Sequence, residues 1–101
     1  MIEQVLINLL KNAAEAVVQS KDPHIELIGR YDGNHIKIEV IDNGPGIIPE
    51  AISRIFVPFY TTKKSGSGIG LSLSRQIMQL HHGTLTVESE PDVKTVFTMR
   101  F

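Results

Sequence analysis

The sequence contains no cysteine, so the chain can form neither a disulfide nor a thiolate metal site. It has no apolar run near the roughly 18 residues that a membrane span needs. Its first residues lack the basic run and the cleavage site of a signal peptide. Charges of the two signs nearly cancel, at a formal net charge of -1. Binding that depends on bulk charge, to a nucleic acid or to a membrane surface, is therefore not expected.

What is present is a chain of 101 residues, enough for one domain with a single modest core. Periodicity and turn residues predict a helix over 1–19, strands over 25–30 and 36–40, a short helix over 50–56, a loop over 57–70, a helix over 71–81, and strands over 85–90 and 95–101. The order of these elements predicts an α+β fold. We expect a two-layer α/β sandwich, with helices on one face of a mixed, mostly antiparallel sheet.

The first helix carries a polar stripe that includes Asn8, Asn12 and Glu15. Residues four apart on a helix point the same way, so the two asparagines share one face. An asparagine carbonyl is a neutral oxygen ligand that suits a Mg2+ already held by phosphate oxygens. The same stripe is also typical of the solvated face of an amphipathic helix, and by itself it does not establish a metal site.

Asp42 follows the second predicted strand and is itself followed by Gly44 and Gly46. An ionised carboxylate only accepts hydrogen bonds. In a pocket, Asp42 would accept from the exocyclic amine of adenine and would repel the carbonyl that guanine has at that place. The two glycines would let the backbone pass close to the base. The alternative is an Asx turn, which Asp-Asn-Gly favours without any ligand.

Three alternating glycines, Gly66, Gly68 and Gly70, precede the helix predicted to start at Leu71. Alternating glycines expose consecutive amide N–H groups, and a helix start adds partial positive charge, so the segment can bind an anion. It lacks the Gly-Lys-Ser/Thr ending of a P-loop, and it follows a loop where a dinucleotide-binding motif follows a strand. A flexible surface loop is the alternative.

The segment over 56–64 combines aromatic side chains with two lysines, Lys63 and Lys64, that could reach phosphates. The alternative is a small hydrophobic cluster beneath a loop, with both lysines in solvent. Few large apolar residues follow Thr61, so little holds the next residues in place without a ligand. We therefore expect residues 60–70 to form a lid that a nucleotide orders.

Together and in this order, the four motifs resemble the N, G1, F and G2 boxes of histidine kinases in the GHKL superfamily, named after gyrase, Hsp90, histidine kinase and MutL. The resemblance covers nearly the whole chain, and four ordered motifs are far more specific than any one of them. It implies the Bergerat ATP-binding fold, ATP and Mg2+ as ligands, and protein-histidine kinase activity.

The resemblance also implies a role for each matched residue. Asn12 corresponds to the Mg2+ ligand, and Asn8 to the polar residue that lines the phosphates one turn earlier. Asp42 corresponds to the aspartate that reads adenine. The other matches are Gly44 and Gly46 beside the base, Lys63 at the phosphates, Gly66, Gly68, Gly70 and Leu71 at the lid and the helix start, and Thr95 as the last-strand threonine that supports adenine through water. The implied catalytic residues are Asn8, Asn12 and Lys63.

The chain departs from the common family pattern at three places. Glu15 stands where many histidine kinases have Lys or Arg, which together with Thr61-Thr62-Lys63 resembles the nitrogen-regulation type of kinase. Lys94 stands where a glycine usually precedes the last-strand threonine. The family also has a strand before the first helix, so we expect a single domain over 1–101 that is truncated at its N-terminus.

The residue at position 8 distinguishes a kinase from a hydrolase. Gyrase-like ATPases place a water-activating glutamate there, whereas the amide of Asn8 cannot act as a general base. None of the histidines has the sequence context of a family phospho-acceptor; they are His24, His35, His81 and His82. The acceptor is therefore expected on a separate part of the protein.

The resemblance implies a cytoplasmic domain, whether or not the parent protein is anchored in the inner membrane. Its direct partner would be the histidine-bearing dimerisation domain of the same protein. The receiver domain of a response regulator would be an indirect partner. No nucleic acid and no direct membrane contact are expected. Two alternatives remain at this point, a degenerate non-catalytic module that binds a nucleotide or a partner, and a GHKL-type ATPase.

Overall fold

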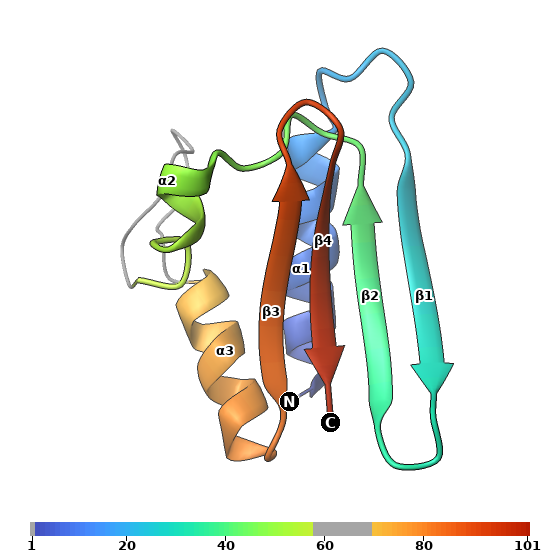
Figure 1. Ribbon diagram of the computed structural model, residues 1–101, viewed down its shortest axis with the longest axis vertical. Coiled ribbons are helices and arrows are strands. Elements are labelled where there is room, and N and C mark those ends of the chain that lie inside the picture. The colour runs from blue at the N-terminus through green and yellow to red at the C-terminus, as the bar shows by residue number, and fades with distance from the viewer. Residues whose placement is uncertain (1, 58–69) are drawn as a thin grey trace.

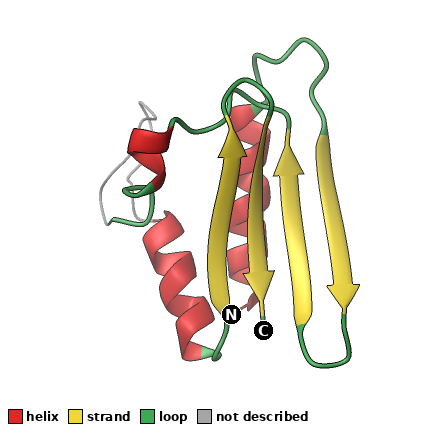
Figure 2. Cartoon of the chain, in the orientation of Figure 1, coloured by secondary structure: helices red, strands yellow, loops and turns green. Residues whose placement is uncertain are grey.

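The computed structural model describes residues 2–57 and 70–101. It contains α1 (Ile2–Ala16), β1 (Ile25–Tyr31), β2 (Ile36–Asp42), α2 (Pro49–Ile52), α3 (Gly70–Leu80), β3 (Thr84–Glu90) and β4 (Lys94–Arg100). The strands form one sheet in the order β1-β2-β4-β3 (Figure 1, Figure 2). The predicted two-layer α+β fold is confirmed, and all pairings among the described strands are antiparallel. No helix within the described ranges is long and apolar enough to cross a membrane.

The core lies between the sheet and the two long helices. On α1, Val5, Leu9 and Ala13 recur at four-residue steps, and all three are buried. The buried cluster consists of Val5, Leu9, Ala13, Val40, Ile55, Ile77, Met78, Leu85, Phe97 and Met99. Since α1, α3 and three of the strands contribute to this one cluster, both helices cover the same face of the sheet. Side chains on the other face of the sheet point away from this core and can be polar.

The apolar side of α3 is narrower than its periodicity predicts. Ile77 and Met78 are buried as expected, but Leu73 and Leu80 are 44% and 75% exposed. Ser74, one turn before Met78, is only 3% exposed. A buried polar side chain at a core-facing position normally has a hydrogen-bond partner. The partner of Ser74 belongs to the site described below.

The ends of the first two helices differ from their predicted positions. The helix predicted over 1–19 ends at Ala16, and the chain then tightens into a turn in which Ser20 N–H donates to the Val17 carbonyl at 3.0 Å. The short helix predicted over 50–56 is shorter and runs from Pro49 to Ile52. Proline at its start is favourable, because the missing N–H would have no helical partner there.

Gly83 lies just beyond the end of α3, but it is not the left-handed residue there. The left-handed residue after α3 is His82, with φ 61°. Gly83 N–H donates to the Met78 carbonyl at 2.8 Å and so closes the helix end. Glycine is required at position 83 for a different reason, because a Cβ there would lie 2.7 Å from the Arg100 carbonyl oxygen.

Candidate functional site

One face of α1 carries Asn8, Asn12 and Ala16 at successive four-residue steps. At a rise of about 1.5 Å per residue, the first and last of them are about 12 Å apart along the helix. Both asparagines are half-buried, whereas Glu15 is exposed. Segments that are distant in sequence contact this face at both of its ends.

The Asn8 end of this face is covered by the first turns of α3. Asn8 Nδ2 donates a hydrogen bond to Ser74 Oγ at 3.0 Å. A Cβ on Gly70 would lie 2.8 Å from Asn8 Oδ1 and 3.0 Å from Nδ2. Glycine therefore lets the start of α3 come this close without displacing the asparagine side chain. The contact places the partial positive charge of a helix N-terminus next to Asn8.

The other end of the face lies below a row of polar side chains on the sheet. Asp42 is 4% exposed at the end of β2, and its register partner on β4 is Thr95, also 4% exposed. The partner of Thr95 on β3 is Ser89, and the two hydroxyl oxygens are 3.1 Å apart. Since direct antiparallel partners point to the same face, these three residues form one polar row across three strands.

The Asp42 carboxylate is both part of a turn and able to accept from a ligand. Its Oδ1 accepts from Gly44 N–H at 2.9 Å, so the Asx turn suggested by the sequence is present. A carboxylate has two oxygens and about four acceptor sites, and the turn uses only one of them. Burial raises the pKa of Asp42 above its ordinary value, and the bond from Gly44 offsets part of this rise.

The loop after Asp42 is held against α1 on one side and against β3 on the other. A Cβ on Gly44 would lie 2.8 Å from the Ala16 carbonyl oxygen, so glycine permits the contact with α1. Gly46 has φ 77°, a left-handed conformation that glycine adopts without strain. Ile47 N–H donates to Ser89 Oγ at 2.7 Å. These contacts fix the loop beside the polar row.

Most of the predicted site residues are thus brought together by α1. Those that the structure describes are Asn8, Asn12, Asp42, Gly44, Gly46, Gly70, Leu71 and Thr95. Leu71 follows Gly70 in the first turn of α3 and packs against the core. Lys63, Gly66 and Gly68 lie outside the described residues, as do positions 60–69 of the expected lid.

Two serines of this region were not predicted from the sequence. Ser74 bonds to Asn8, and Ser89 joins the loop after Asp42 to Thr95. The sequence contains one signal for Ser74, which is a hydroxyl at a position where helical periodicity calls for a core side chain. Ser89 gives no such signal, because alternation along a strand does not tell which polar residue meets a loop.

The side-chain oxygen donors on the face of α1 between Asn8 and Ala16 are neutral. In the part of the chain that the structure describes, no group of three or more His, Cys, Asp or Glu residues could hold a metal ion. Asn8 and Asn12 instead offer side-chain amides. This donor set fits a Mg2+ held mainly by substrate phosphates, which is how proteins commonly bind this ion.

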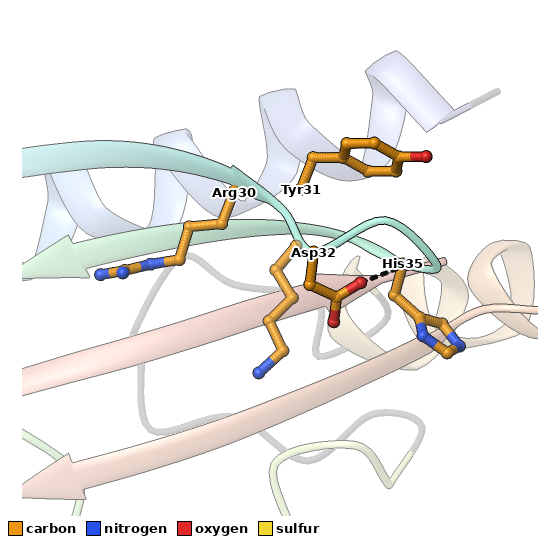
Figure 3. A pocket seen from close by; sticks show the side chains of 5 residues that line it. Arg30, Tyr31, Asp32 and His35 are labelled. Atoms are coloured by element: carbon orange, nitrogen blue, oxygen red, sulfur yellow. Dashed lines mark hydrogen bonds between the residues drawn. The ribbon is translucent and has the colours of Figure 1, made fainter.

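A surface hollow lies at the opposite end of β2, at the turn between β1 and β2 (Figure 3). It is lined by Arg30, Tyr31, Asp32, His35 and Lys37, all of them exposed. Asp32 Oδ1 accepts from the backbone N–H of His35 at 2.7 Å and of Asn34 at 3.0 Å, and these bonds lower the pKa of Asp32. Because the whole length of β2 separates this turn from Asp42, the hollow is not part of the site.

The whole chain matches one family model. The model is described as "Histidine kinase-, DNA gyrase B-, and HSP90-like ATPase", and it matches residues 1–101. The C4-dicarboxylate transport sensor protein DctB of Rhizobium meliloti is 44% identical over 94 residues, which are 93% of this chain and 15% of that protein. The signal transduction histidine-protein kinase AtoS of Escherichia coli is 38% identical over 99 residues, which are 98% of this chain and 16% of that protein. The chain thus spans about a sixth of the length of these relatives.

Solved structures of similar proteins have the same fold. The catalytic domain of histidine kinase ThkA superposes with a TM-score of 0.85 at 35% identity, covering 99% of this chain and 64% of that one. Full-length ShkA in complex with AMPPNP superposes with a TM-score of 0.81 at 28% identity, covering 96% of this chain and 20% of that one.

Proposed function

This chain belongs to the family of histidine kinase-, DNA gyrase B- and HSP90-like ATPases, and from this membership we propose a complete reaction for it. The chain is a histidine kinase ATP-binding catalytic domain, homologous to those of two-component sensor kinases. It binds ATP with Mg2+ and donates the γ-phosphoryl group to a histidine on a separate dimerisation domain of the same protein. The observation that carries this proposal is the α1 face, where Asn12 lies between the α3 contact at Asn8 and the loop contact at Ala16.

We assign the adenine end of the site to the polar row of the sheet. Asp42 accepts a hydrogen bond from the exocyclic amine of adenine. It does so through acceptor sites of its carboxylate that the Asx turn does not use. Gly44 and Gly46 border the base, and Thr95 supports it through water. The burial of Asp42 and Thr95 side by side supports this assignment, since a ligand bond is stronger where bulk water does not compete.

We assign the phosphate end to the contact between α1 and α3. The start of α3, at Gly70 and Leu71, faces the phosphates with its partial positive charge, and Asn8 lines them. Asn12 holds the Mg2+, which neutralises charge on the transferring group. Lys63, Gly66 and Gly68 complete this end of the site.

A kinase fits position 8 better than a hydrolase does. The Asn8 amide bonds to Ser74 and has no useful proton affinity, so it cannot activate a water molecule. Transfer to a histidine needs no such base, because neutral imidazole is itself a nucleophile. The domain has mainly to position the reacting groups and to neutralise charge on the phosphates. None of the four histidines of this chain belongs to the α1 face or to the polar row, so we place the acceptor on another domain.

We further propose that the parent protein is a sensor kinase of the nitrogen-regulation type. Glu15 and the Thr61-Thr62-Lys63 segment support this subtype. The phosphoryl group then passes from the dimerisation domain to the receiver domain of a response regulator. The domain acts in the cytoplasm, where ATP is available.

A titration of ATP with and without Mg2+ tests this function. The chain should bind ATP more tightly with Mg2+, and Asn12→Ala should reduce that gain by roughly tenfold or more, since even an outer-shell metal partner contributes about this much. Metal-free binding should change little. Gln19→Ala, an exposed polar truncation beyond the end of α1, is the control. If the folded chain binds no ATP, the function is refuted; if Mg2+ helps Asn12→Ala as much as the parent, Asn12 is only part of a polar helix face.

Gly70→Ala should weaken ATP binding several-fold without loss of stability. Alanine suits a helix at least as well as glycine, but its Cβ would displace the Asn8 side chain. Calorimetric titration and thermal unfolding of the same variant measure the two effects separately. Gly29→Ala is a matched control, since a Cβ there has no neighbour within 4 Å. Parental ATP affinity in Gly70→Ala would contradict the placement of the phosphates at this helix start.

A further inference from the structure

Ser74 is a buried hydroxyl in the contact between the two long helices. It is 3% exposed and lies on the same side of α3 as Met78, one turn away. Its Oγ accepts from Asn8 Nδ2 at 3.0 Å, across 66 positions of sequence. An apolar side chain would contribute more to the core at this position. The hydrogen bond to Asn8 is therefore what distinguishes serine from alanine here.

The Asn8 amide is held against α3 by two residues that lie one turn apart on that helix. Its oxygen only accepts and its nitrogen only donates, so the two ends are chemically different. In the structure it is the nitrogen that points to the serine. Gly70 lies next to the same amide, since a Cβ there would be 2.8 Å from Asn8 Oδ1 and 3.0 Å from Nδ2. A movement of the Asn8 side chain away from α3 would cost the bond to Ser74.

From this arrangement we infer that Ser74 is a positioning residue for the phosphate end of the site. Ser74 takes one of the two Nδ2 protons of Asn8. The second proton remains for a phosphate oxygen, and Oδ1 remains for water on the metal. Ser74 touches no phosphate and acts only through Asn8. The inference rests on the proposed function, since the orientation of Asn8 matters to a ligand only if phosphates bind beside it.

A double-mutant cycle on the 101-residue chain, with ATP and adenosine as ligands, tests this role. Ser74→Ala should weaken ATP binding about three- to tenfold, the usual effect of one hydrogen bond. Adenosine has no phosphates, so its affinity should not change. In an Asn8→Ala background, Ser74→Ala should have no further effect, because its partner is already gone. Ser74→Thr keeps the hydroxyl and should bind ATP more tightly than Ser74→Ala.

The controls separate this role from a purely structural one. Gln76→Ala is an exposed truncation on the same helix and should match the parent. Thermal unfolding checks that each variant is folded. Parental ATP affinity in Ser74→Ala, equal losses for ATP and adenosine, or additive effects in the cycle would each overturn the inference while the proposed function stands. Failure of the parent to bind ATP would overturn the proposed function itself, and this inference with it.

Discussion

Asp42→Asn should weaken ATP binding by about 1.5–3 kcal/mol, the contribution of a hydrogen bond to a charged group. This corresponds to roughly a ten- to 150-fold rise in Kd. The amide that replaces the carboxylate has only one acceptor oxygen, and that oxygen is already needed by Gly44 N–H. Calorimetric titration of the variant and of the parent measures the difference. Parental ATP affinity in a folded Asp42→Asn variant would refute the assignment of Asp42 to adenine.

The free energy of unfolding of Asp42→Asn should not fall together with its ATP affinity. Because burial raises the pKa of Asp42, the native state holds its proton to higher pH than the unfolded chain does. Stability therefore falls as the pH rises from the ordinary aspartate pKa through the raised one, and it stays lower at neutral pH. Asparagine has no charge to bury, so Asp42→Asn should be at least as stable as the parent at pH 7. Asp32→Asn, at the other end of β2, makes the same chemical change and should leave ATP affinity unchanged.

Leu9→Ala should lower the free energy of unfolding by about 2–5 kcal/mol, the range for removing a fully buried leucine. Leu9 is 0% exposed and packs in the cluster that joins α1 to α3 and the sheet. The loss combines the transfer of apolar surface with a cavity that the neighbouring side chains cannot fill. Urea unfolding, compared at an equal m-value, measures it.

Ile7→Ala is the matched control for this loss. Ile7 lies two positions before Leu9 on the same helix, but its side chain is 64% exposed. Its truncation should change stability by no more than about 0.5 kcal/mol, as is usual for surface substitutions. Equal losses at the two positions would show that α1 is not seated on the sheet as described. The same result would remove the basis for placing Asn8 and Asn12 at a common site.

Local patterns predict much of this fold because they depend on neighbours in the sequence. The apolar spacing of α1 and the alternation of the last two strands each correspond to an element of the structure. The fold class followed from the order of these elements. The predicted ends of the helices were less accurate, since the last turn of a helix depends on what the chain contacts next.

The predicted site residues are those that carry motifs, and the missed ones depend on contacts across the fold. Asn12 and Asp42 were predicted by type and spacing. Ser74 lies 66 positions from its partner, and Ser89 lies 42 positions from Ile47. No short pattern contains both members of such a pair. Gly83 shows the same limit, because its need for glycine comes from the carbonyl of Arg100 and not from the helix that it follows.

The face of α1 between Asn8 and Ala16 determines which changes of sequence this domain can tolerate. Each residue inserted into a helix rotates all that follows by about 100° and shifts it by about 1.5 Å. A single insertion here would keep the contact with Gly70 but would turn Ala16 away from Gly44. Replacing an exposed side chain such as Ala14 disturbs neither contact. At the exposed positions of these two turns, the number of residues is constrained more strongly than their identity, and natural variation should appear there as substitutions with no change of length.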